Sequence, residues 1–187
     1  MLNNLTALLD SGAAPAVGDY ESIQTVTVGT AQASIAFTSI PSTYKHLQIR
    51  SIAQCTTNTS PWQRIVVAFN SDTTNSNYAD HLLQGNGSTA SAVAETSSRK
   101  GFGLAAQSGS TYFGANITDL LDYSNTNKYK TSRTLRGFDS NGTYSNQIIT
   151  LESNLWMSTA AISSITLTLE DSSNFNTYSS FALYGVK

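Results

Sequence analysis

The C-terminal segment, residues 161–187, constrains the fold most strongly, because its apolar residues recur at every second position. Apolar and hydroxyl residues alternate in ITLTL (165–169), and FALYGV (181–186) has the same period. A period of two is typical of half-buried antiparallel strands, whose side chains point alternately to opposite faces. Turn-forming residues, DSSN (171–174), lie between the two runs. We therefore expect two consecutive strands that form a hairpin, in a sheet built by the rest of the chain.

Further strands are expected along most of the chain, separated by turn residues. Residues 64–70 form a nearly continuous apolar run, which is typical of a central strand covered on both faces. Ile117 and Leu120 are expected to anchor the strand at 111–121, and Asn141–Gly142 is the strongest hairpin signal. Residues 71–94 are expected to be irregular, anchored by Tyr78, Leu82 and Leu83. The other expected strands lie at 20–28, 34–40, 46–54, 131–139 and 145–151, with weak strand character at 95–106.

The composition also favours an all-β fold. Hydrophobic residues make up 40% of the 187 residues, which suffices for a core, whereas charged residues make up only 12%. Hydroxyl and amide side chains supply the remaining polarity, and these suit exposed strand faces better than helix surfaces. We expect one antiparallel β-sandwich of jelly-roll-like type with a short N-terminal helical arm.

The N-terminal arm is defined by four leucines. Leu2, Leu5, Leu8 and Leu9 have helix-like spacing over at most two turns, and the small residues 13–19 that follow read as a linker. A helix this short is not stable alone, so it must dock on something. The arm packs either on its own domain or on a neighbouring subunit or a larger assembly. We expect residues 1–19 to be a docking arm and linker, and residues 20–187 to be the β-sandwich domain.

No residue pattern indicates catalysis or a cofactor. His46 and His81 have no metal-ligand spacing with each other or with Cys55, which reads as a small buried hydrophobe. The aspartates at 72 and 80, or at 119 and 122, would suit calcium chemically, but no calcium-loop spacing is present. The glutamates are scattered, so no acid and base pair is visible. We expect a protein that is not an enzyme and that binds no metal and no cofactor.

The charge and hydropathy patterns exclude two classes of partner. The formal net charge is −2 and no basic stripe is present, which argues against nucleic-acid binding. No apolar run is long enough to cross a bilayer, so we expect no membrane partner.

Aromatic residues in or beside the expected loops suggest a different kind of binding. Trp62, Tyr78 and Tyr112 are candidates for stacking on sugar rings, with polar loop residues binding the hydroxyls. The alternative is that these rings plug the ends of strands or line a subunit interface.

Several segments together resemble a group of tailed-bacteriophage virion proteins, which are described as decoration-like or tail-fibre-like. These segments are ESIQTVTV (21–28), SIAFTSIPSTYKHLQIR (34–50), AFNSDTTNSNYADHLLQGNGSTA (68–90), ISSITLTL (162–169) and SSFALYGVK (179–187). The resemblance implies a virion structural protein with a jelly-roll-like fold. The group has no agreed catalytic residues, so none is transferred to this chain.

The resemblance and the arm together predict a capsid decoration (cement) protein. Such a protein assembles in the host bacterial cytoplasm and is located in the virion. Its expected partners are itself, as a homotrimer, and the major capsid protein, on which the arm docks. The alternative is a tail-tip or fibre-associated module that binds host surface glycans through Trp62, Tyr78 and Tyr112.

Overall fold

The computed structural model describes residues 18–109, 111–143 and 147–187, which fold into twelve strands and one 3-10 turn. Every ladder between these strands is antiparallel, which confirms the predicted all-β, antiparallel class. The elements are β1 (Tyr20–Thr27), β2 (Ser34–Phe37), β3 (His46–Ala53), β4 (Trp62–Phe69), η1 (Asn75–Asn77), β5 (Tyr78–Gly85), β6 (Ala90–Glu95), β7 (Leu104–Ala106), β8 (Gly114–Leu121), β9 (Lys130–Phe138), β10 (Ile148–Trp156), β11 (Ile165–Leu169) and β12 (Ser180–Val186).

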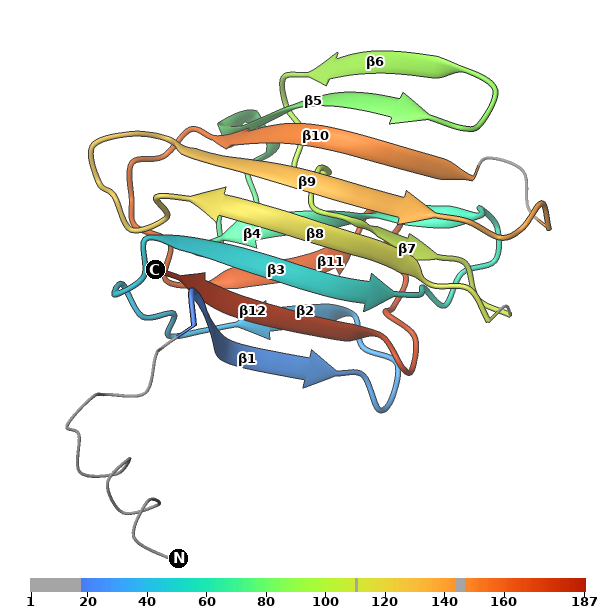
Figure 1. The fold of residues 1–187 in the computed structure, drawn as a ribbon, viewed down its shortest axis with the longest axis horizontal. Helices are drawn as coiled ribbons and strands as arrows, with labels where there is room; N and C mark the ends of the chain where they lie inside the picture. The colour runs from blue at the N-terminus through green and yellow to red at the C-terminus, as the bar shows by residue number, and fades with distance from the viewer. Residues whose placement is uncertain (1–17, 110, 144–146) are drawn as a thin grey trace, which may run out of the picture.

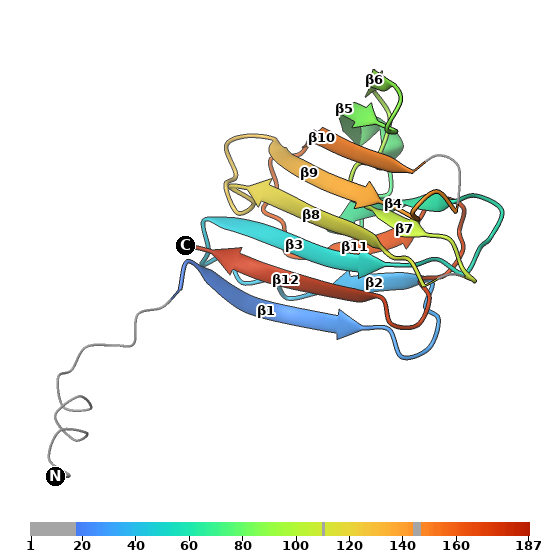
Figure 2. The same cartoon turned by 45° about the vertical axis from the view of Figure 1, so that its right-hand side comes forward.

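The strands form two sheets (Figure 1). The large sheet has the order β1-β12-β3-β8-β9-β10-β5-β6, and the small sheet has the order β2-β11-β4-β7. Two pairs of strands, β5–β6 and β9–β10, are insertions that extend the large sheet beyond β8. When they are left out, consecutive strands alternate between the two sheets from β1 to β4 and again from β7 to β12. We call the strands β9, β10, β5 and β6 the extension; Figure 2 shows them continuing the large sheet past the small one.

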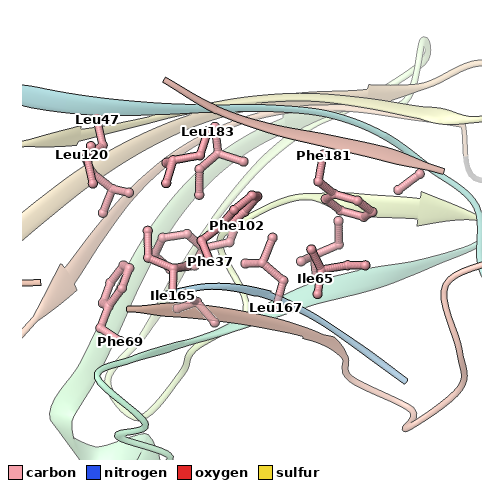
Figure 3. Packing of buried hydrophobic residues seen from close by; sticks show 14 of the residues in the cluster. Phe37, Leu47, Ile65, Phe69, Phe102, Leu120, Ile165, Leu167, Phe181 and Leu183 are labelled. Carbon is pink, nitrogen blue, oxygen red and sulfur yellow. The ribbon is translucent and has the colours of Figure 1, made fainter. Parts of the chain in front are cut away.

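The apolar core lies between the small sheet and the β1–β8 part of the large sheet. Leu47, Leu183 and Phe181 point from the large sheet toward Ile165 and Leu167 of the small sheet (Figure 3). All five side chains are buried within one hydrophobic cluster. Their positions follow from the alternation along β3, β12 and β11, whose every second residue faces inward. Burial of these aliphatic and aromatic side chains is the main stabilising contribution in this half of the molecule.

The C-terminal alternation predicts its strands correctly but not their pairing. The two strands, β11 and β12, lie in different sheets: β11 pairs with β2 and β4, whereas β12 pairs with β1 and β3. The connection between them crosses from one sheet to the other, and Phe175 within it forms isolated bridges with Gln32 and Cys55. The predicted hairpin is therefore wrong. β4 lies between β11 and β7 with its last five residues buried, which confirms the predicted central strand.

The segment predicted to be irregular, residues 71–94, contains β5 and most of β6. The sequence does not indicate β5 as a strand, because both of its faces mix apolar and polar residues. Asp80 and Leu82 point inward, whereas His81 and Leu83 are exposed. Period-2 patterns are recognisable only when one face is consistently apolar. By contrast, the Asn141–Gly142 turn is confirmed, with φ of 50° and 77° between the paired strands β9 and β10.

Candidate docking surface

The outer face of the large sheet, which points away from the small sheet, carries large aliphatic side chains. Six of them are between 44% and 60% exposed: Ile52, Leu83, Ile117, Leu135, Ile149 and Leu151. They come from β3, β5, β8, β9 and β10, so most of them lie on the extension and on β8 beside it. We call this surface the apolar face.

The strand register arranges these side chains in two adjacent rows. In the first row Ile117 is paired with Leu135, Leu135 with Leu151, and Leu151 with Leu83. Directly paired residues of neighbouring antiparallel strands have Cβ atoms about 4.5–5.5 Å apart, so the four side chains form one continuous ridge. The second row mixes large and small residues in the order Ile52, Ala115, Gly137, Ile149 and Gly85.

The small residues of the second row create a hollow on the apolar face. Ala115 and Gly137 are paired across β8 and β9. The hollow has a volume of about 550 Å³, and its lining includes both of these residues together with Ile52, Ile117 and Ile149. The hollow is therefore a largely apolar recess, which lies beside the ridge formed by the first row.

A polar row borders the ridge on its other side. The carboxylate of Asp119 accepts a hydrogen bond from Gln48 Nε2 at 2.7 Å and lies 3.4 Å from Arg133 Nη2. Arg50 donates from Nε to Gln48 Oε1 at 2.6 Å, and its guanidinium lies 5.0 Å from the ring centre of Tyr20. The charges of Asp119 and Arg133 therefore balance each other, whereas Arg50 has only neutral partners in these contacts.

The inner face of the extension is rich in buried polar side chains, in contrast to the apolar face on the other side of the sheet. Arg136 on β9 and Glu152 on β10 are both buried and form an ion pair. Burial raises the pKa of Glu152 to about 7, although the Arg136 charge acts in the opposite direction. Asp80 on β5 is also buried and accepts a hydrogen bond from Ser98 Oγ at 2.9 Å, and burial raises its pKa too.

These inner polar groups bind a backbone segment rather than the apolar core. The carbonyl oxygen of Gly101 accepts a hydrogen bond from Asn154 at 3.0 Å. That of Phe102 accepts one from Thr118 at 3.3 Å, and that of Gly103 accepts one from Arg136 at 2.5 Å. A buried carbonyl needs a donor, which explains why strands β8, β9 and β10 present polar side chains inward here. Alternation then forces their aliphatic residues to the outer face.

The structure separates the three aromatic residues predicted for glycan binding. Tyr78 is 1% exposed, and its ring lies 6.3 Å from that of Trp156 while its hydroxyl donates to Asp72 O at 3.0 Å. Its ring therefore offers no face to a sugar in this structure. Trp62 and Tyr112 are partly buried beside a second, smaller cluster around Phe138, so these two rings lie in one region without Tyr78.

The arm leucines, Leu2, Leu5, Leu8 and Leu9, lie outside the described residues. Cys55 is buried, as predicted, and burial raises its pKa to about 11, so the thiol is protonated at neutral pH. His46 Nδ1 accepts a hydrogen bond from the backbone of Asp122 at 2.9 Å, whereas His81 is exposed on the outer face.

The aspartates considered for calcium have other partners. Asp122 pairs with Lys128 and Asp119 with Arg133, while Asp72 accepts hydrogen bonds from Trp156 and Asn77. Over residues 18–109, 111–143 and 147–187, no group of three histidine, cysteine or acidic residues is arranged to hold a metal ion. Among the same residues there is also no helix with the length and hydropathy of a membrane span.

Sequence reasoning missed the apolar face. The available signal was the spacing of Ile117 and Leu120, which were both expected to anchor β8. Residues three apart in a strand point to opposite faces, so both cannot be inside. In the structure Leu120 is 1% exposed and Ile117 is 44% exposed, which corrects that expectation.

Comparisons of the chain with models of protein families, with curated proteins and with solved structures find no match.

Proposed function

We propose that this chain is a structural subunit of a tailed-bacteriophage particle, acting as a capsid decoration (cement) protein without catalytic activity. The observation that carries the proposal is the apolar face. Exposed aliphatic side chains in a continuous ridge are unfavourable in water and are typical of surfaces that pack against protein. The resemblance of five segments to phage virion proteins supplies the kind of assembly.

The jelly-roll-like fold is part of this proposal and is supported by the sheet orders. When the β5–β6 and β9–β10 insertions are left out, the large sheet keeps the order β1-β12-β3-β8 and the small sheet the order β2-β11-β4-β7. Eight strands in two sheets, with the first strand beside the last, are what a double-sheet jelly roll requires. The insertions are then additions to that framework, and they bear most of the apolar face.

The N-terminal helical arm remains part of the proposal as the element that docks on the major capsid protein. Its four leucines require a partner surface, and an arm joined to an oligomer gains avidity when several copies bind the same particle. The apolar face and the arm would then have separate roles, one within the protein's own oligomer and one toward the capsid.

Glycan binding is a second candidate, favoured by one cleft. Trp62 lines a cleft of about 200 Å³ together with Arg64, Gln84, Asn86 and Gln147. An indole beside amide and guanidinium groups is chemically suited to a sugar ring and its hydroxyls. In this reading the protein is a tail-tip or fibre-associated module, and Tyr112 would assist from the same cluster.

The deciding experiment is the copy number of this chain in purified particles, measured by quantitative peptide mass spectrometry against the major capsid protein. A copy number comparable to that of the capsid protein is expected for a decoration protein. A number far lower would instead support the tail-associated, glycan-binding function, which a glycan-binding assay with Trp62→Ala would then test. Absence from particles would overturn the virion role.

A further inference from the structure

We propose that the apolar face is the surface through which copies of this chain bind one another. This inference deepens the proposed function by naming the partner of the face and the residues that form the contact. It concerns Ile117, Leu135, Leu151 and Leu83 of the ridge, and the hollow floored by Ala115 and Gly137 beside them.

The size of the face fits a protein partner. The six aliphatic side chains expose on the order of 600 Å² together, at the upper end of what monomers leave exposed and near the ~800 Å² per partner of a standard interface. A contact of this size between two folded copies would cover both rows and extend into the polar row.

The charges of the face favour a copy over a differently charged protein. Arg133 and Asp119 already pair with each other, and Arg50 is held by Gln48 and by the rings of Tyr20 and Tyr184, at 5.0 and 4.9 Å. Arg50 has only neutral partners in these contacts, so the face carries little net charge and no strongly charged partner is called for. A second copy presents the same weakly charged, apolar surface bordered by a polar rim, as interfaces commonly do.

The shape of the face is also self-complementary. A ridge and a hollow lie side by side, so the ridge of one copy has a recess of matching chemistry on another. A symmetric pair requires one patch that is complementary to itself, and a closed ring requires two complementary patches on each copy. The apolar face supplies ridge and recess for either arrangement.

The test is the assembly state of the full chain, measured by analytical ultracentrifugation from about 1 to about 100 μM, where a dissociation constant near 1 μM is resolved. We expect the wild type to form dimers or trimers. Leu151→Lys, which places a charge in the ridge, should raise the dissociation constant at least about tenfold. Ser34→Lys is the matched control, because it adds the same charge at an exposed strand position of the small sheet, outside the apolar face, and it should have little effect.

A second variant separates a fitted contact from general stickiness. Gly137→Val fills the hollow while keeping the face apolar, and a Cβ there has room, with Ile148 O at 3.6 Å and an Ile149 side-chain atom at 3.9 Å. We expect Gly137→Val to weaken assembly although it adds apolar surface. Unchanged or stronger assembly of this variant would overturn the fitted interface.

Other results also decide the matter. A monomeric wild type, or an oligomer that Leu151→Lys leaves intact, would overturn the proposal. Loss of the oligomer on deletion of residues 1–10, with no effect of Leu151→Lys, would overturn it in favour of the arm. A monomer that is abundant in particles would refute this interface but not the virion role, whereas an oligomer absent from particles would do the reverse.

Discussion

Leu135 and Arg136 are consecutive residues of β9, yet the leucine is 49% exposed and the arginine is 3% exposed. The same inversion occurs on β10, where Leu151 is exposed and Glu152 is buried. The usual arrangement of an antiparallel sheet is apolar inside and polar outside. The extension reverses it, because its inner face binds the backbone of residues 101–103 and its outer face is the proposed interface.

Removal of the buried arginine should be strongly destabilising. Arg136→Met at pH 8 leaves the Glu152 carboxylate buried without its ion-pair partner, and we expect the free energy of unfolding to fall by about 3–5 kcal/mol in urea denaturation. The double variant Arg136→Met/Glu152→Leu removes both charges and should recover much of the loss.

Arg133→Met is the control for this prediction, because Arg133 lies on the same strand and pairs with Asp119 at the surface. Exposed ion pairs contribute little, so a loss of about 1 kcal/mol or less is expected. Equal losses for Arg133→Met and Arg136→Met would contradict the structural role of the buried pair.

Glu152 should make the protein less stable as the pH rises from 4.5 to 7. Its pKa is raised from an ordinary 4.5 to about 7, so between these values the folded state holds a proton that the unfolded state has released. Stability from this group is therefore complete below pH 4.5 and is lost as the pH rises through 7, by on the order of 3 kcal/mol. The raised pKa of Asp80 acts in the same direction.

The measurement is the midpoint of urea unfolding at pH values across that window. Glu152→Gln should flatten the dependence, whereas Glu95→Gln should leave it, because the pKa of Glu95 is lowered and its contribution changes only below its ordinary pKa. A wild-type midpoint that is constant or rises from pH 5 to pH 7 would refute the assignment to Glu152.

The sequence predicts the strands well where one side of the alternation meets the apolar core. In β11, β12 and β3 the apolar side faces the small sheet, so the pattern indicates both the strand and its buried face. In β9 and β10 the period is equally clear, but either side of the strand could be the inner one. Apolar residues are normally assigned to the interior. Here the polar side chains face inward instead, because they donate hydrogen bonds to the carbonyl groups of residues 101–103.

The sequence does not reveal the apolar face for the same reason, because its aliphatic residues alternate with polar ones and such residues are normally assigned to a core. For the residues predicted to bind glycans, the reason for the error is different. Tyr78 lies in β5, which was expected to be a loop, and a tyrosine in a strand covered by the core is buried. Pairing between sheets, as for β11 and β12, depends on long-range packing that no local pattern encodes.

Gly185 of β12 should not tolerate a side chain. An added Cβ would lie 2.3–2.4 Å from three atoms of the Tyr44 ring, closer than any real contact. We expect Gly185→Ala to lower the free energy of unfolding by about 1–3 kcal/mol, as overpacking does.

Gly29→Ala is the control, because Gly29 lies outside the apolar face, shortly after β1 of the large sheet, and an added Cβ there would have no atom within 4 Å. This change should be neutral or slightly stabilising. If Gly185→Ala is as harmless as Gly29→Ala in thermal unfolding, the close packing of Tyr44 against β12 is wrong.

Deletion of residues 1–10 should abolish association with particles and leave the sandwich folded. The first described strand begins at Tyr20, and all the core residues found among the described residues follow it, so we expect the thermal unfolding of the truncated protein to match that of the full chain. Association is measured by cosedimentation of purified protein with particles that lack it.

Leu5→Ala/Leu8→Ala should lose binding as the deletion does, whereas Asn3→Ala/Asn4→Ala, which keeps the leucines, should retain most of it. Because the proposed contact between copies is made by the apolar face, the oligomer should persist in every one of these variants. Undiminished association of the truncated protein would refute the docking role of the arm.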